Sequence, residues 1–295
     1  MRKKITIIGA GPGGYVAALK GAILGAEVTL VERDRLGGTC LNRGCIPTKA
    51  FLKSAEIYEE AQIAGSFGVS CGDVNADYVA IKNRKDGVVN QLVGGIKFLL
   101  MKKNVNIVQG VGKLMPGKKV EITKADGTVK IIESDAVILA NGSIPVIPAM
   151  FNYDGDRIIT SDELLRLKEL PKSMIIVGGG VIGCEFGQFY RKLGTEVTIV
   201  EMAEHILPNE DVDVASVISN RMKMQGVKFY TGIGVTKVEK KDGLVTATIA
   251  TGEELSAEYM LLSIGRKANI EGIVVETVDI MMEKGKVVVN DKMET

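Results

Sequence analysis

The sequence predicts an α/β protein built around two parallel β-sheets, because one strand–loop–helix–strand pattern occurs twice among its 295 residues. In each copy a short apolar strand runs into the loop G-x-G-x-x-G, an apolar helix follows, and the next strand ends in a glutamate. Alternating stretches around turn signals predict a small antiparallel β-meander beside each parallel sheet. Together these observations predict two domains of the same architecture on one chain.

The first copy begins with a strand over Lys4–Ile8 and carries its glycines at Gly9, Gly11 and Gly14. Glycines in such a loop let backbone N–H groups approach a pyrophosphate at the N-terminus of the following helix. Glu32 ends the next strand, where its carboxylate can accept hydrogen bonds from an adenosine ribose. This combination predicts a Rossmann-like dinucleotide-binding domain.

The second copy repeats the first at a constant offset along the chain. Its glycines are Gly178, Gly180 and Gly183, and its acid, Glu201, follows the first glycine at the same spacing as Glu32 follows Gly9. One glycine triplet alone is a weak signal, but a strand, loop, helix, strand and acid repeated in register predict two dinucleotides bound by one chain.

The remaining elements are predicted from hydrophobic periodicity and turn residues. Pro145 and Pro148 mark a boundary, so we predict one domain over 1–148 and a second over 149–271. Helices are predicted over 48–64, 77–103 with interruptions at Gly87 and Gly94-Gly95, 162–168 with Ser161 as its cap, and 211–225; strands are predicted over 105–111, 119–123, 129–132, 136–139, 227–230, 259–264 and from 287, with short antiparallel strands over 235–251.

Composition argues against several classes of function. The net charge is +1, so no overall field attracts nucleic acid or an anionic membrane, and we expect neither as a partner. No run approaches the ~18 apolar residues that a transmembrane helix needs, and no signal-peptide cleavage site is recognisable, so we expect a cytoplasmic protein. Four cysteines in a chain of this length do not form a secreted disulfide framework, and no metal site is predicted.

Cys40 and Cys45 form the most informative pair in the sequence. In a regular α-helix residues five apart have Cα atoms ~8.7 Å apart, whereas a disulfide tolerates roughly 4.4–6.8 Å. If the two cysteines pair, the segment must be a distorted turn, for which Gly44 supplies backbone freedom. Cys45 is expected just before a helix N-terminus, which favours its thiolate. A disulfide that closes so short a loop adds little to stability, so a redox-active disulfide explains the pair better than a structural one does. The alternative is two unrelated cysteines on a buried turn.

The flanking residues favour the redox interpretation. The stretch GGTCLNRGCIPTK over 37–49 resembles the active-site signature of the pyridine nucleotide-disulfide oxidoreductases. Within that family it most resembles the dihydrolipoamide dehydrogenases, and the glutathione and mercuric reductases less closely. Asn141-Gly142-Ser143-Ile144-Pro145 is similar to the family's flavin-contacting ATGSxP turn, with Asn141 in place of Thr. The resemblance runs from Met1 to about Asn290.

The resemblance assigns roles to individual positions. It implies that Cys40 is the interchange thiol that meets the substrate and Cys45 the charge-transfer thiol against the flavin, so that after reduction Cys45 should be the more buried thiol and Cys40 the faster alkylated. It implies that Lys49 lies near the flavin and pairs with Glu185 from the other domain. FAD-contacting positions would be Gly9, Gly11, Gly14, Glu32, Gly38, Thr39, Lys49, Gly112, Gly142 and Ser143, and NAD-contacting positions Gly178, Gly180, Gly183, Glu201, Val235 and Gly265.

The implied reaction is the oxidation of dihydrolipoamide to lipoamide by NAD+, through the cysteine pair and FAD. The substrate would be carried on a lipoyl domain of a 2-oxo acid dehydrogenase or glycine cleavage complex. Residues 272–295 would begin the return of the chain to the flavin domain, and the interface domain of the family, with its catalytic histidine, is not in this sequence. We therefore expect a homodimer for the full-length enzyme but not for this chain, weak FAD binding, and little activity from the chain alone. The single histidine, His205, is expected to be exposed.

Two other interpretations compete with this one. A glutathione- or mercuric-type reductase would run from nicotinamide to substrate; such enzymes often use NADPH, which the carboxylate of Glu201 opposes. The other alternative is that the chain is not an enzyme but a non-catalytic dinucleotide-binding fragment.

Overall fold

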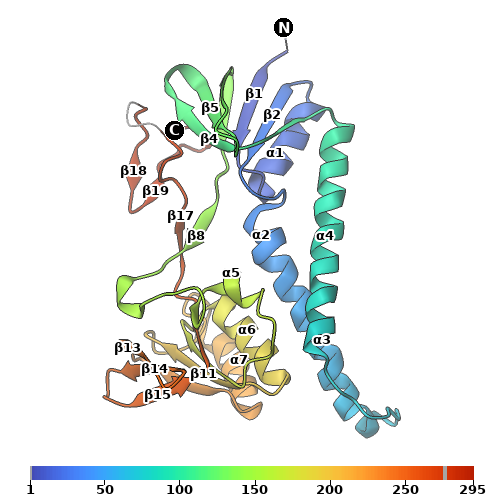
Figure 1. Ribbon diagram of the computed structural model, residues 1–295, viewed down its shortest axis with the longest axis vertical. Helices are drawn as coiled ribbons and strands as arrows, with labels where there is room; N and C mark the ends of the chain where they lie inside the picture. Colours follow the sequence, from blue (N-terminus) through green and yellow to red (C-terminus); the bar gives the residue numbers. More distant parts are fainter. Residues whose placement is uncertain (1, 275–277) are drawn as a thin grey trace. The chain divides into compact units, whose positions relative to one another are not determined.

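The computed structural model of the protein describes residues 2–274 and 278–295, and the predicted α/β architecture is confirmed (Figure 1). The chain divides into two compact units. Unit 1 comprises residues 1–45, 89–144 and 266–295, and unit 2 comprises residues 46–88 and 145–265. Among the described residues no helix is both long and apolar enough to cross a membrane.

Unit 1 contains the first parallel sheet, in the order β3-β2-β1-β7. Helix α1 connects β1 to β2, and the buried side chains of Ile7 and Leu30 form the centre of the core between sheet and helices. The predicted strand 105–111 proves to be two strands in different sheets, because Gly110 at φ +158° turns the chain between them. The bounds are β1 Lys4–Ile8, α1 Pro12–Ile23, β2 Glu27–Glu32, β3 Asn106–Gln109 and β7 Ala136–Leu139, with an antiparallel sheet of β4 Val111–Met115, β5 Lys119–Thr123 and β6 Val129–Glu133.

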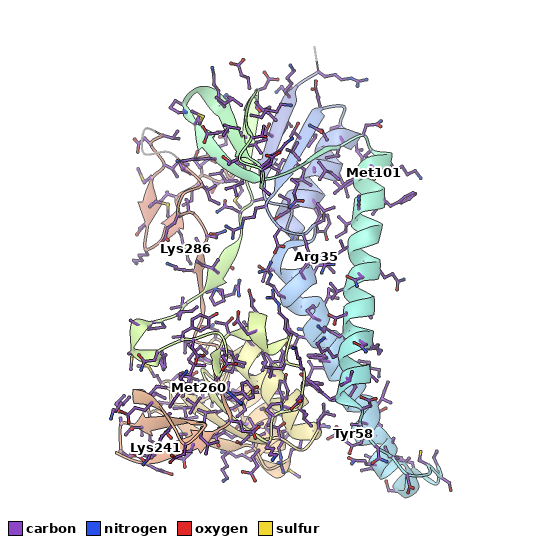
Figure 2. All side chains as sticks on the ribbon, viewed as in Figure 1. Arg35, Tyr58, Met101, Lys241, Met260 and Lys286 are labelled. Atoms are coloured by element: carbon purple, nitrogen blue, oxygen red, sulfur yellow. A yellow bond between two sulfur atoms is a disulfide. The ribbon has the colours of Figure 1, made fainter. Side chains whose placement is uncertain are left out.

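Unit 2 contains the second parallel sheet, in the order β12-β11-β10-β16-β9. Its first four strands occur in the same order as those of the first sheet, as the repeat in the sequence predicts. Figure 2 shows Met260 of β16 among the side chains of this unit, where it is fully buried. The bounds are β9 Ile158–Ile159, β10 Ser173–Val177, α6 Val181–Lys192, β11 Glu196–Glu201, α7 Val212–Met224, β12 Lys228–Thr231 and β16 Tyr259–Leu262, with a meander of β13 Val235–Lys241, β14 Leu244–Ile249 and β15 Glu254–Ala257.

The helices α3 and α4 differ most from the prediction. Helix α3 spans Cys45–Ile63, and α4 spans Tyr78–Lys102 without a break, although interruptions were predicted at its glycines. A Cβ added at Gly87, Gly94 or Gly95 would meet nothing within 4 Å, so these residues mark neither a kink nor a close approach.

Residues 46–88 belong to unit 2 by packing, whereas the sequence placed them in the domain 1–148. Phe51 of α3 stacks on Phe189 of α6 with ring centroids 4.4 Å apart, and both side chains are fully buried. Lys85 of α4 is also buried, and its Nζ donates to the carbonyl oxygen of Leu165 at 2.9 Å. That the chain is divided into an FAD-binding and an NAD-binding domain remains a prediction.

Several shorter elements complete the chain. The predicted strand from 287 is a two-residue strand that ends at Val287, and the predicted closing strand ends at Leu262 instead of Ile264. The short elements are α2 Gly38–Arg43, β8 Ser143–Pro145, β17 Arg266–Ala268, β18 Met282–Glu283, β19 Lys286–Val287 and the single-turn helices Ala64–Phe67, Pro116–Lys118 and Ala149–Phe151.

Helix α5 spans Ser161–Leu164, and the residue that caps it is Thr160, which corrects the prediction of Ser161. The Thr160 hydroxyl accepts the N–H of Asp162 at 3.2 Å, and the Glu163 carboxylate accepts the N–H of Thr160 at 2.9 Å. This capping box satisfies N–H groups on both sides of the helix start. Ser161 is instead the first residue inside the helix.

Thr160→Ala should therefore lower the free energy of unfolding by about 1 kcal/mol, because it removes the N-cap oxygen. Ser161→Ala is the matched control and should lower it by less than half as much. Urea unfolding followed by circular dichroism measures both. A larger effect at Ser161 than at Thr160 would contradict the capping assignment.

Candidate active site

Cys40 and Cys45 form a disulfide in the structure, with Cα atoms 4.7 Å apart. Cys40 lies in α2, and Cys45 is the first residue of α3, which therefore begins earlier than the predicted Thr48. Gly44 separates the two helices with φ −143° and ψ −111°, so the chain is not helical between the cysteines. This break shortens the distance from the ~8.7 Å of a continuous helix to one that a disulfide can span.

The two cysteines differ in exposure and in position. In this disulfide form Cys45 is exposed and Cys40 is half-buried, and the order of burial expected after reduction stays a prediction. Cys45 stands at the N-terminus of the 19-residue helix α3, whose dipole stabilises a thiolate there. After reduction of the bond, the position of Cys45 therefore favours thiolate formation.

The start of the cysteine segment is fastened to the first glycine loop. The N–H of Gly37 donates to the carbonyl oxygen of Ala10 at 2.8 Å. Gly38 has φ +59°, and a Cβ there would lie 2.5 Å from the Cα of Gly11. A residue with a side chain would push these two segments apart, so glycine is required at position 38.

The first glycine loop has the close backbone packing that a phosphate-binding turn needs. Gly9 has φ +100°, and a Cβ on Gly14 would lie 1.8 Å from the carbonyl oxygen of Gly9. Helix α1 starts after Gly11 with no side-chain cap among the described residues. The N–H groups of its first turn are therefore available to an anion.

Glu32 closes this loop from the end of β2. Its carboxylate accepts the N–H of Ala10 at 2.7 Å and the N–H of Asp34 at 2.8 Å. Burial raises the pKa of Glu32, and the hydrogen bonds from the backbone of Ala10 and Arg33 oppose that rise. Each carboxylate oxygen has a second lone pair, so the group can still accept a ribose hydroxyl.

The second glycine loop repeats this arrangement. A Cβ on Gly183 would lie 2.1 Å from the carbonyl oxygen of Gly178. Glu201 accepts the N–H of Gly179 at 2.6 Å and the N–H of Ala203 at 2.8 Å, as Glu32 does at the equivalent positions. The two loops therefore share both their glycine packing and their acid contacts.

The turn after β7 forms with Asn141 at the position where the family pattern has Thr. The Asn141 side-chain amide donates to the carbonyl oxygen of Asn269, and the Asn269 amide donates to that of Asn141 at 3.1 Å. Gly142 has φ +70°. Arg266 donates from Nε to Ser143 Oγ at 2.9 Å and from its terminal guanidinium nitrogen to the Ser143 carbonyl at 2.7 Å. Sequence reasoning missed this reciprocal amide pair, because its members are far apart in the chain.

The other predicted contact residues are placed as follows. Thr39 is half-buried in α2, and Gly112 of β4 lies against the side chains of Val31 and Ile8. Val235 is buried at the start of β13. Gly265 has φ +125°, and its carbonyl oxygen accepts the N–H of Val146 at 3.0 Å.

Lys49 and Glu185 meet, as the resemblance implies, with Lys49 Nζ 2.8 Å from a Glu185 oxygen. Both residues lie in unit 2, on α3 and α6, and not in different compact units. The Lys49 side chain is 59% exposed and that of Glu185 is 25% exposed, so the expected desolvation is small. An ion pair this exposed contributes about 0–1 kcal/mol to stability.

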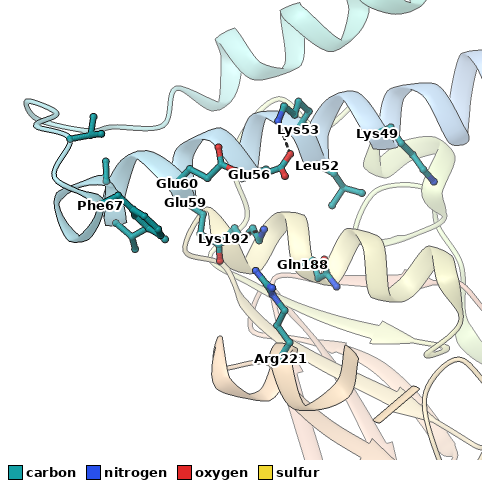
Figure 3. Close-up of a pocket in the computed structure, with 13 residues that line it drawn as sticks. Lys49, Leu52, Lys53, Glu56, Glu59, Glu60, Phe67, Gln188, Lys192 and Arg221 are labelled. Atoms are coloured by element: carbon teal, nitrogen blue, oxygen red, sulfur yellow. Dashed lines mark hydrogen bonds and ion pairs between the residues drawn. The ribbon is translucent and has the colours of Figure 1, made fainter. Parts of the chain in front are cut away.

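A groove of about 930 Å³ begins at Lys49 and follows α3 past Leu52 towards Phe67 (Figure 3). Its opposite wall is formed by α6 and α7, from which Lys192 and Arg221 project. Lys192 pairs with Glu59 at 2.6 Å. Burial alone would raise the pKa of Glu59, but hydrogen bonds from Lys192 and Gln225 lower it. The Lys192–Glu59 pair thus holds α3 against α6.

His205 and Cys184 carry side chains of reactive types outside the disulfide. His205 is half-buried and not exposed as expected, with Nδ1 2.8 Å from the carbonyl oxygen of Ile206. Cys184 is buried in α6, and its thiol donates to the carbonyl oxygen of Gly179 at 3.2 Å. Burial raises the pKa of Cys184 to about 12, which makes it unreactive.

Comparisons with known proteins agree with this geometry. The pyridine nucleotide-disulphide oxidoreductase family model matches residues 3–295. Dihydrolipoyl dehydrogenase of Bacillus subtilis (strain 168) is 39% identical, over 99% of this chain and 64% of its own length. Mitochondrial dihydrolipoyl dehydrogenase of Dictyostelium discoideum is 42% identical, over 100% of this chain and 62% of its own. The crystal structure of LpdA from Mycobacterium tuberculosis matches with a TM-score of 0.90 and 30% identity, over 96% of this chain and 63% of its own. The chain thus spans less than two thirds of the length of each of these relatives.

These relationships imply the use of FAD and NAD(H). The residues present fit two dinucleotides. In both loops the packing leaves no room for a side chain at the third glycine, which brings backbone N–H groups to the position of a pyrophosphate. In both units the acid at the end of the second strand faces the loop and keeps lone pairs for a ribose.

Gly14→Ala should weaken FAD binding at least about tenfold and lower the free energy of unfolding by about 1–3 kcal/mol, because the new methyl overlaps the Gly9 carbonyl. Gly13→Ala is the matched control, since a Cβ there meets nothing within 4 Å. Quenching of flavin fluorescence measures the affinity, and urea unfolding measures the stability. Equal FAD affinities for the two variants would contradict the assignment of the first loop to FAD.

Proposed function

Because the chain belongs to the pyridine nucleotide-disulphide oxidoreductase family, we propose that it passes electrons between a dithiol and a nicotinamide dinucleotide. The observation that carries the proposal is the Cys40–Cys45 disulfide, whose segment is hydrogen-bonded to the first of two duplicated dinucleotide loops. In the whole protein the dithiol is dihydrolipoamide, the acceptor is NAD+, and the product is lipoamide. The similarity to dihydrolipoyl dehydrogenases over nearly all of this chain supports that choice.

The chemistry of the pair is thiol–disulfide exchange. One substrate thiolate attacks the sulfur of Cys40, forms a mixed disulfide and expels Cys45 as a thiolate, which the N-terminus of α3 stabilises. The second substrate thiolate then attacks the substrate sulfur of the mixed disulfide and expels Cys40 as a thiolate. Lipoamide leaves as a cyclic disulfide, and the two electrons remain on the protein as the Cys40 and Cys45 thiols. The first glycine loop and Glu32 would hold FAD, which would supply two-electron transfer between the thiol pair and NAD+.

The substrate thiols must lose protons in these steps, which requires a base. His205 is the single histidine of the sequence, and it lies in unit 2 with Nδ1 against a backbone carbonyl oxygen. It follows the acid of the second glycine loop and not the cysteine segment, so we propose that another group supplies the base in the whole protein and that the 295-residue chain alone turns over dihydrolipoamide slowly. For the whole protein we propose a homodimer that acts on lipoyl domains of a 2-oxo acid dehydrogenase or glycine cleavage complex.

The second loop is the proposed NAD site. The Glu201 carboxylate would face the 2′ position of the adenosine ribose, where it accepts a hydroxyl and repels a phosphate. The residues that follow it, Met202-Ala203-Glu204-His205, contain no arginine that could neutralise a 2′-phosphate. This favours NADH over NADPH and disfavours the glutathione-reductase type of function.

With FAD added, NADH should reduce the Cys40–Cys45 disulfide of this chain, since that half-reaction needs no substrate base. Alkylation with iodoacetamide followed by mass spectrometry should then find both thiols labelled, with Cys40 labelled faster because bound FAD would cover Cys45. Cys71 is the internal control, because it is exposed and should be labelled with or without NADH. A disulfide that stays intact while bound FAD is reduced would contradict the proposed electron path.

Calorimetric titration should show that NADH binds at least about tenfold more tightly than NADPH. Glu201→Gln should narrow that difference, because it removes the repelling charge. Glu204→Gln removes an equal charge from an exposed neighbour and should leave the ratio unchanged. Equal affinities of the unaltered chain for the two dinucleotides would refute the role of Glu201.

A further inference from the structure

Asn42 lies between the two cysteines, in α2, and its side-chain amide makes two hydrogen bonds. Its Nδ2 donates to the carbonyl oxygen of Leu36 at 2.9 Å and to that of Gly38 at 2.9 Å. An amide NH2 carries two donors, and only this orientation of the side chain can satisfy two carbonyl acceptors. The orientation of Asn42 is therefore fixed by its partners.

The two carbonyls that Asn42 holds flank Gly37. The N–H of Gly37 is the group that donates to Ala10 of the first glycine loop, and Gly38 is the residue whose Cα lies against Gly11. Asn42 thus links the helix that carries Cys40 to the turn that fastens this helix to the loop.

The oxygen of the Asn42 amide is buried at an energetic cost. Asn42 Oδ1 is buried and has no hydrogen-bond partner among the described residues. Burying an unpaired polar atom is unfavourable, so the two donated bonds are retained at a cost. Leucine or alanine would avoid that cost but would release the carbonyls of Leu36 and Gly38.

We propose that Asn42 is a positioning residue for the redox pair, which sets the thiol–disulfide equilibrium of Cys40 and Cys45. By holding the 36–38 turn and α2 together, the amide fixes the backbone that carries Cys40 and so limits how far the Cys40 sulfur can move from Cys45 when the bond is reduced, which raises the effective concentration of the two thiols and favours the disulfide. This inference deepens the proposed function, but the equilibrium can be measured without flavin or nicotinamide. If the Asn42 proposal fails, the proposed function is therefore unaffected, and the reverse also holds.

The test is equilibration of the flavin-free chain with mixtures of reduced and oxidised dithiothreitol. In the exchange the protein disulfide becomes a dithiol while one dithiothreitol is oxidised to its cyclic disulfide. Acid quenching, alkylation and mass spectrometry give the ratio of the two protein forms. Asn42→Asp and Asn42→Ala should each shift the equilibrium towards the dithiol by about tenfold, which corresponds to hydrogen bonds that are together about 1.4 kcal/mol stronger in the disulfide form than in the dithiol form.

Asn106→Asp is the matched control. Asn106 lies in β3 of the same unit and donates at 3.3 Å to the Thr29 hydroxyl, which can donate to an aspartate instead. The thiol–disulfide equilibrium constant of this variant should stay within twofold of that of the unaltered chain. If Asn42→Asp does not fold, because its oxygens face two carbonyls, Asn42→Ala decides. An equilibrium within twofold of the unaltered chain for folded Asn42→Ala, or a shift towards the disulfide, would overturn the proposal and leave Asn42 a stability residue.

Discussion

The hydrogen bond between a strand-end carboxylate and the second residue of each glycine loop organises both halves of this protein. Glu32 holds the N–H of Ala10, and Glu201 holds the N–H of Gly179. The carbonyl oxygens of these same two residues accept N–H groups from the segment that follows the acid, Gly37 in one unit and Leu207 in the other. The same loop residue therefore joins the acid, the phosphate loop and the next segment of chain. A dinucleotide bound at either loop contacts a framework whose geometry is already fixed.

The repeat extends beyond the glycines into this next segment. Gly38 and Leu207 occupy equivalent positions of the repeat, and both adopt left-handed backbone conformations, with φ +59° and φ +53°. Such a conformation costs a non-glycine residue about 1 kcal/mol, so its retention at Leu207 indicates that the turn is required. In unit 1 the close approach to Gly11 makes glycine obligatory at this point, which explains why the Gly-Gly pair precedes the cysteines.

The sequence was most informative where a local pattern determines the structure. The strands of the two parallel sheets, the glycine loops and the strand-end acids were predicted correctly from such patterns, whereas the Lys49–Glu185 pair was implied only by the resemblance and lies within one unit and not between two. The misses have identifiable causes. Strand β9 is too short to show a period, and the packing of α3 depends on contact with Phe189, which is distant in the chain. Thr160 and Ser161 are both good caps, and only the position of Glu163 relative to each distinguishes them.

The cysteines lie in a segment where the two copies of the repeat differ. In the second copy α7 leads directly into β12, whereas in the first copy the helix that leads into the equivalent strand β3 is α4, so α2 and α3 are additional elements of the first copy. In unit 2 the segment between the acid and α7 is irregular, whereas the equivalent segment after Glu32 contains α2 and Cys40. A disulfide requires that α2 and α3 do not merge, and Gly44 provides that break where Cys45 can still begin a helix. One connection in a duplicated fold thus acquires redox chemistry through a short helix, a break and a helix N-terminus, while the dinucleotide loop beside it stays unchanged.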